Sequence, residues 1–112
     1  MTIDVKRVKI AVAVPEAKLD EVRDAMCEAG CGRIGNYSHS TMATLITGTF
    51  KGNDKTNPYI GKKNVLESCQ EIKLEALCDI KDAAKVLAAI RRVHPYEEPG
   101  IDIYPMIDEA DL

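Results

Sequence analysis

The sequence has little excess charge and no long apolar run. Its 15 basic and 18 acidic residues leave a formal net charge of only -3, so no strong field attracts a polyanion, and nucleic acid is not expected as a partner. No apolar stretch is longer than residues 10–14, which is too short for a membrane span or for the core of a signal peptide. We therefore expect no membrane association and a cytoplasmic location.

Cysteine is also scarce. The chain has four cysteines in 112 residues and is neither short nor loop-rich enough to require disulfide bonds, so we expect reduced thiols. Cys27 and Cys31 lie one helical turn apart, but no second close pair completes the spacing of a zinc site. They are interpreted as small buried apolar side chains, and no metal or cofactor is expected.

The remaining composition is typical of a folded protein. Hydrophobic residues make up 46% of the chain and charged residues 29%, which is far from the high-charge, low-hydrophobicity signature of disorder. A chain of 112 residues can build one hydrophobic core but not two. We therefore expect a single domain that spans residues 1–112.

Apolar periodicity predicts the elements in the first half of the chain. Residues 8–14 alternate in a way that indicates a half-buried strand. Pro15 suits a first helical turn and Gly30 a helix end, so the apolar positions at helical spacing between them predict a helix over about 15–29. Residues 37–50 are rich in Thr, Ser, Ile and Tyr and predict a second strand, whose faces the pattern does not assign.

The second half predicts a connection, a strand, a helix and a strand. Residues 51–63 gather glycine, asparagine and proline and predict an exposed connection, and residues 71–78 predict a third strand with one charged face. Asp82 is expected to cap a second helix that ends at the His94–proline step, and residues 101–104 predict a fourth strand. The order predicts an α+β, ferredoxin-like βαββαβ fold, in which an antiparallel sheet has two helices on one face.

The string GCGRIG at residues 30–35 matches the glycine spacing of a dinucleotide-binding loop. Such a loop follows a strand and opens a helix. Here Gly30 is predicted to end a helix and Gly35 to lead into a strand, so the helix dipole points the wrong way for a pyrophosphate. We therefore do not expect this string to bind a nucleotide.

The run HPYEEP at residues 94–99 is the densest set of reactive groups in the chain. It places an imidazole, a phenol and two carboxylates in a turn stiffened by two prolines. Three interpretations are open: a structural crossover from the second helix into the fourth strand, a contact for a ligand or partner, and a metal site. We predict that the turn lies at the surface beside the connection 48–61, where the two segments form the rim of a cleft.

The strings GCGRIGNYSHS, TGTF, NPYIG and HPYEEPGIDIYP occur in this order. Together they resemble the insert domain of the YqfO/Nif-three-like family over nearly the whole chain, and the HPYEEP turn is also similar to the corresponding turn of CutA proteins. The resemblance implies a PII/CutA-like version of the ferredoxin-like fold, present here as a free-standing chain. Two departures are Ser40, where the family usually carries cysteine, and Ile46, where glycine is common. The first argues against a thiol-based role for this strand.

The same resemblance implies a function. In full-length members the insert interrupts a larger domain that carries a two-metal site. We expect this chain to lack that site, so metal-dependent hydrolase activity is not transferred to it, and catalysis is not expected. The expected function is a non-catalytic regulatory module that binds a small effector or a protein partner as a homo-oligomer, with a trimer favoured. The alternatives are a CutA-like divalent-metal-binding protein and an enzyme with an unrecognised site at the HPYEEP turn.

Three sets of residues belong to these hypotheses. The candidates for ligand or partner contact are His94, Tyr96, Glu97, Glu98, Tyr37, His39, Asn57 and Tyr59. The candidates for an oligomer face, on the side of the sheet opposite the helices, are Ala11, Ala13, Lys73, Glu75 and Leu77. The alternative metal ligands are His94, Glu97, Glu98 and His39.

Overall fold

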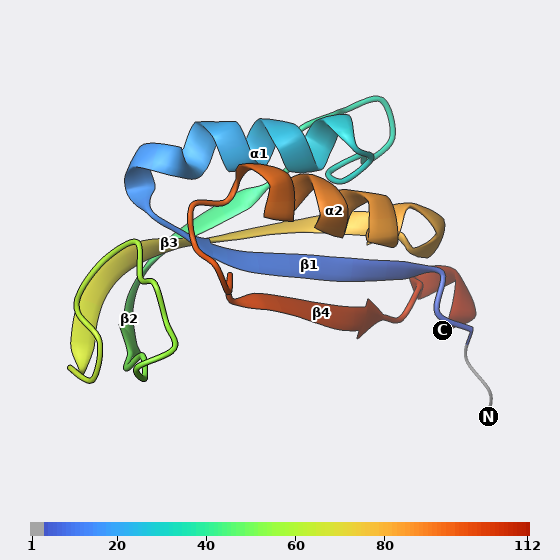
Figure 1. Cartoon of the computed structure of the whole chain (residues 1–112). Coiled ribbons are helices and arrows are strands. Elements are labelled where there is room, and N and C mark those ends of the chain that lie inside the picture. Colours follow the sequence, from blue (N-terminus) through green and yellow to red (C-terminus); the bar gives the residue numbers. More distant parts are fainter. Residues whose placement is uncertain (1–3) are drawn as a thin grey trace.

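The structure is a computed structural model that describes residues 4–112. Within these residues, one antiparallel sheet of four strands carries two α-helices on one of its faces (Figure 1). The strands are β1 (Arg7–Val14), β2 (Met42–Phe50), β3 (Glu67–Asp79) and β4 (Ile101–Met106), and the helices are α1 (Leu19–Glu28) and α2 (Ala83–Val93). The predicted ferredoxin-like βαββαβ fold is confirmed.

The strand order is β2-β3-β1-β4, so β1 lies inside the sheet between β3 and β4. Because antiparallel partners share a face, the register places the predicted apolar positions of β1 beside those of β3: Val8 opposite Cys78, Ile10 opposite Ala76, Val12 opposite Leu74 and Val14 opposite Ile72. All of these side chains are buried in the core beneath the helices. The face assigned to β1 from its alternation is therefore correct.

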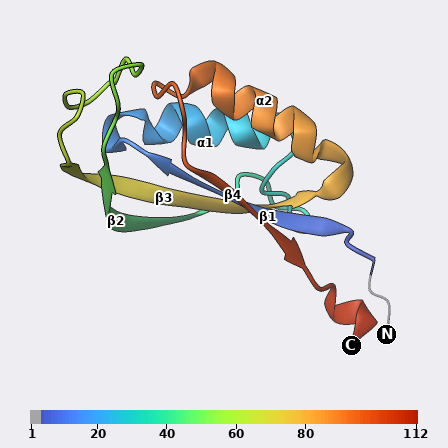
Figure 2. The same cartoon turned by 60° about the horizontal axis from the view of Figure 1, so that its bottom comes forward.

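The two helices close this core from one side. Val22 and Met26 of α1 and Val86 and Ile90 of α2 are fully buried, each pair four residues apart and thus on one side of its helix. Burying each of these side chains contributes about 1.5–3 kcal/mol. The helices also pack against each other above the sheet, as Figures 1 and 2 show.

Several predicted boundaries are wrong. The strand expected over 37–50 begins at Met42, because His39 has a positive φ angle that a strand does not accommodate. The segment 16–18 after Pro15 is a 3-10 turn, and α1 begins only at Leu19. β3 begins earlier than expected, at Glu67.

The predicted cap of the second helix is also wrong in its chemistry. Asp82 does occupy the N-cap position of α2, but its side chain makes no capping hydrogen bond. A 3-10 turn over Ile80–Asp82 precedes α2 and gives Asp82 helical backbone angles in place of the extended ones that a capping side chain needs.

The sheet face opposite the helices differs in part from the predicted oligomer face. The register places Ala11 opposite Glu75 and Ala13 opposite Lys73 on that face, as expected. Ala11, however, is only 2% exposed in the single chain. Lys73 pairs with Glu75 of its own strand, with 3.0 Å between Nζ and Oε1, so this pair is already made before any partner arrives.

Within residues 4–112, no helix is long and apolar enough to cross a membrane.

Candidate functional site

The HPYEEP turn, residues 94–99, lies against the connection 51–66 between β2 and β3. The backbone N–H of Asn57 donates a hydrogen bond of 2.8 Å to Oε1 of Glu97, and the rings of Tyr59 and Tyr96 are 6.0 Å apart between centroids. Figures 1 and 2 show why: β2 and the start of β3 curve away at one end of the sheet, where the chain also leaves α2 for β4. The predicted meeting of the two segments is confirmed.

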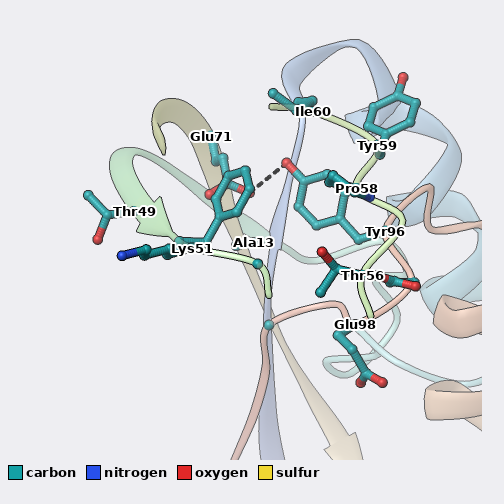
Figure 3. Close-up of a pocket in the computed structure, with 14 residues that line it drawn as sticks. Ala13, Thr49, Lys51, Thr56, Pro58, Tyr59, Ile60, Glu71, Tyr96 and Glu98 are labelled. Atoms are coloured by element: carbon teal, nitrogen blue, oxygen red, sulfur yellow. Dashed lines mark hydrogen bonds between the residues drawn. The ribbon is translucent and has the colours of Figure 1, made fainter. Parts of the chain in front are cut away.

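A cleft of about 350 Å³ lies between these segments, a volume within the range of small-molecule sites. Phe50, Pro58, Tyr59 and Ile60 give it apolar walls on one side. Tyr96, Glu97 and Glu98 of the turn line the other side, and the end of β1 contributes Ala13 (Figure 3). The cleft is thus mostly apolar, with a few carboxylates and hydroxyls among its lining groups.

His94 lies beneath the turn and not on its rim, so its predicted place at the surface is wrong. It is 7% exposed, and its Nδ1 accepts a hydrogen bond from the backbone N–H of Tyr96 at 3.1 Å. The proton is therefore on Nε2, which donates to the carbonyl oxygen of Ala13 at 2.8 Å. Burial lowers the pKa of His94 below its ordinary value. Both ring nitrogens are used in holding the turn to β1, which leaves neither for a ligand or a metal.

Tyr96 and Glu71 form a polar pair at the cleft. The Tyr96 hydroxyl donates a hydrogen bond of 3.0 Å to Oε2 of Glu71, drawn as the dashed line in Figure 3. Burial, and after it the bond to Glu71, raises the pKa of Tyr96 well above its ordinary value, so its hydroxyl stays a donor. Glu71 itself is only 8% exposed although it lines the cleft.

Gly48 of β2 leaves space for this carboxylate. A Cβ atom built at position 48 would collide with Oε1 of Glu71, so any other residue there would force the carboxylate to move. The TGTF string therefore has a structural reason for its glycine at this point in β2. A glycine inside a strand pattern is a signal of such close approach.

Glu71, Gly48 and Phe50 were not among the predicted site residues. The alternation of β3 assigned Glu71 to a charged face, but alternation does not reveal that one charged residue on that face is buried. Ala13 lies on the face predicted for contact between copies, and it also lines the cleft, a role that was not predicted for it. The burial of these residues depends on how the connection folds back, which local sequence patterns do not specify.

Tyr37 and His39 lie at the other end of the sheet. Their loop is attached there by the backbone N–H of Gly32, which donates to the carbonyl oxygen of Leu77 at 2.7 Å. Leu77 pairs with Lys9, near the start of β1, whereas the cleft lies at the end of that strand. Figure 1 shows this loop after α1 far from the connection between β2 and β3. Within one chain, these two candidates therefore do not join the others.

The same separation breaks up the alternative metal set. His39 and His94 are at opposite ends of the sheet, and Glu97 accepts the Asn57 N–H. Among residues 4–112, no three His, Cys, Asp or Glu side chains come together in the manner of metal ligands.

No family model matches the chain as a whole or in part. A curated relative from Halalkalibacterium halodurans, named a GTP cyclohydrolase 1 type 2 homolog, is 46% identical over 103 residues, which are 92% of this chain and 28% of the relative. One from Listeria innocua with the same name is 43% identical over 99 residues, 88% of this chain and 26% of the relative. The chain thus spans about a quarter of the length of these curated relatives.

Solved structures extend the comparison. A Bacillus cereus protein related to NIF3 superposes with a TM-score of 0.81 at 36% identity, over 96% of this chain and 27% of its own. CutA from Synechococcus elongatus gives a TM-score of 0.69 at 13% identity, over 95% and 81%, and GlnK from Bacillus subtilis gives 0.60 at 15%, over 90% and 85%. The last two likenesses show the fold alone. The chain is therefore homologous, over nearly its whole length, to a segment of the NIF3-related proteins, and it has the fold of CutA and GlnK.

Proposed function

We propose that this chain is a non-catalytic, ligand-binding regulatory module and that the cleft between the HPYEEP turn and the connection 51–66 is its ligand site. The observation that carries the proposal is the cleft itself. Two segments far apart in sequence are fixed together by the bond from Asn57 to Glu97, and they enclose about 350 Å³ of mostly apolar space that contains a buried carboxylate. Concave, mostly apolar sites with a few placed polar groups are typical of ligand pockets.

The chemistry of the lining groups favours binding over catalysis. His94 is the only histidine near the cleft, and both of its ring nitrogens are occupied. The Cys69 thiol lies near Glu71, and burial, followed by that carboxylate, raises its pKa, so the reactive thiolate is disfavoured. An activated nucleophile beside a free base, which covalent catalysis requires, is therefore not formed by these groups.

The relatives' names do not transfer an activity. Those names, GTP cyclohydrolase 1 type 2 homolog, describe proteins of which this chain spans about a quarter. One CutA neighbour is called a divalent cation tolerance protein, but its likeness shows the fold alone. The separation of His39 from His94 does not favour a CutA-like metal site in the single chain.

A ligand screen with a matched pair of variants tests the proposal. Metabolites and nucleotides are screened for those that raise the melting temperature, because a ligand that binds only the native state stabilises it. Ala13→Leu fills the cleft, and Ala88→Leu makes the same change on the exposed side of α2. We expect at least one compound to stabilise the parent and Ala88→Leu but not Ala13→Leu. The proposal fails if no compound stabilises the parent, or if every stabilising compound acts equally on Ala13→Leu.

The edge strand β2 favours a homo-oligomer as the second part of the proposal. Its nine residues, MATLITGTF, include no charged residue and no proline, and Leu45 is 62% exposed. The opposite edge, β4, carries Asp102 and Pro105, which discourage pairing with another strand. A long, uncharged edge with unpaired backbone groups is a template for another chain. We therefore propose that β2 takes part in the contact between copies. This edge borders the open face of the sheet, which was the contact face predicted from the sequence.

A further inference from the structure

The charge of the cleft is set by carboxylates that have no cation beside them. Glu71, Glu97 and Glu98 line the cleft, and among residues 4–112 none of the three forms an ion pair with Lys, Arg or His. Lys51 is the one basic lining residue, and Figure 3 shows its side chain directed away from Glu71 and Tyr96. The cleft therefore presents negative charge to whatever enters it.

Glu71 is the most informative of these carboxylates because it is buried. Its Oε2 accepts the Tyr96 hydroxyl. Its Oε1 faces Gly48, which has no side chain to cover it, and the hydrogen bonds of the described chain include none to Oε1. Because no fully buried side-chain oxygen of residues 4–112 lacks a partner, Oε1 is open to the cleft. The Cys69 thiol, a weak donor, also lies near the carboxylate. A carboxylate that is largely buried loses most of its favourable interaction with water. A positively charged partner would compensate for that loss.

The walls around Glu71 suit a cation with an apolar body. Tyr96 and Tyr59 present rings whose centroids are 6.0 Å apart, and Phe50, Pro58 and Ile60 add apolar surface. The faces of aromatic rings attract cations, and apolar walls bury the rest of the ligand. An anionic ligand would meet three carboxylates and no facing lysine.

We propose that the cleft takes a small organic cation, with an amine or guanidinium group at Oε1 of Glu71 and an apolar body against Tyr59, Tyr96 and Phe50. This inference rests on the proposed function, because it names the ligand class of the same cleft. It assigns Glu71 as the residue that determines selectivity for charge. It also assigns Gly48 as the position that keeps Oε1 accessible.

A matched series of probes tests the charge. Phenethylamine, phenethyl alcohol and hydrocinnamate share the phenylethyl body and are cationic, neutral and anionic at neutral pH. Dissociation constants are measured by titrating the labelled protein and following the backbone amide signals of Gly48, Asn57, Tyr59 and Tyr96. We expect the cation to bind at least roughly tenfold more tightly than the alcohol, and the anion to bind most weakly.

Two variants locate the charge that is recognised. Glu71→Gln keeps an oxygen that accepts the Tyr96 hydroxyl but removes the negative charge. We expect it to lose the roughly tenfold preference for phenethylamine while phenethyl alcohol binds within about twofold of its affinity for the parent. Glu28→Gln, at the exposed end of α1, changes the net charge equally and should keep the preference.

Three outcomes would overturn the inference. If the parent binds the three probes with equal affinity, the cleft does not select its ligand by charge, although it remains a ligand site. If a folded Glu71→Gln variant keeps the preference for phenethylamine, Glu71 is not the cause of that preference. If none of the probes shifts the amide signals of the cleft in the parent, the assigned ligand class is wrong. The screen of metabolites and nucleotides against the parent and Ala13→Leu then tests the proposed function separately. The comparison of the three probes on the parent protein needs no variant, so charge selectivity is tested even if Glu71→Gln does not fold.

Discussion

His94 belongs to a run of potentially reactive residues, but its side chain holds the HPYEEP turn in place. Its ring joins the turn to β1 through Ala13 and orders the turn itself through the N–H of Tyr96. The bond from Tyr96 requires the neutral imidazole with its proton on Nε2, because a protonated Nδ1 cannot accept, whereas the bond to Ala13 is compatible with either form. Protonation therefore competes directly with the geometry that forms one wall of the cleft.

This predicts a dependence of stability on pH that belongs to His94. Burial holds its folded pKa below the unfolded value of about 6.5. The neutral form is thus favoured on folding: its contribution is complete above the unfolded pKa and declines as the pH falls towards the lower folded pKa. Urea unfolding should show that the parent loses free energy of unfolding between about pH 7.5 and pH 5, and that His94→Gln loses less over the same interval.

The control for this experiment is His39→Asn. His39 is exposed at the other end of the sheet, and its positive φ angle suits asparagine. This variant should keep the pH dependence of the parent and change the free energy of unfolding by less than about 0.5 kcal/mol, whereas His94→Gln should cost about 1–3 kcal/mol at neutral pH. An identical pH dependence in the parent and in His94→Gln would show that His94 does not cause it.

At the level of elements, the connection 51–66 is a long loop with little apolar burial of its own. It is attached to the HPYEEP turn by the N–H of Asn57 on Glu97 and by the contact between Tyr59 and Tyr96. Inside the loop, the backbone carbonyl oxygen of Asn53 accepts from the Thr56 hydroxyl at 2.7 Å. The cleft exists only while this loop stays folded against the turn, so its shape depends on a small number of contacts.

Removing one of these contacts should loosen the loop without unfolding the sheet. Glu97→Ala leaves the Asn57 N–H without its acceptor, so hydrogen exchange at Asn57 and its neighbours should become at least several-fold faster, while the core amides of β1 keep their protection. Glu98→Ala removes a neighbouring carboxylate for which no bond to the loop is found in the structure, and it is the matched control. Unchanged exchange at Asn57 in Glu97→Ala would mean that other contacts hold the loop.

At the scale of the whole molecule, the proposed assembly rests on the contrast between the two edges of the sheet. β2 is long and uncharged, whereas β4 carries Asp102 and Pro105. Three charged residues of the open face, Lys9, Lys73 and Glu75, are already paired within the chain. Copies of the chain therefore have more to gain from the β2 edge than from new ion pairs on the open face.

A charge on that edge should prevent assembly. Light scattering of the parent should give a mass that is a multiple of the 12.3 kDa of one chain, and Leu45→Lys should give a single-chain mass, because a lysine on an edge strand disfavours pairing. Ile80→Lys places the same charge on an exposed apolar position away from the sheet edges and should leave the mass of the parent unchanged. A parent of 12.3 kDa, or a folded Leu45→Lys variant with the mass of the parent, would contradict the proposed contact.

The sequence by itself determined the order of the elements and the inward face of the central strand. Val8, Ile10, Val12 and Val14 alternate cleanly, so their burial follows from a period of two residues, and the apolar spacing in both helices follows from a period of 3.6. It also predicted, from the polar and glycine clusters of the two segments, that the HPYEEP turn meets the connection between β2 and β3, and the strand order does bring both to one end of the sheet. These features depend on local periodicity and on connectivity, which the sequence displays directly.

Only the tertiary structure decided which polar residues the cleft contains. His94 turned inward because both of its ring nitrogens find backbone partners, and Tyr37 and His39 remained at the far end because Gly32 attaches their loop beside Leu77. Glu71 became a buried cleft residue because the loop after β2 folds over it and Gly48 leaves it room. Such placements depend on contacts between segments distant in sequence, and no local pattern of residue types specifies them.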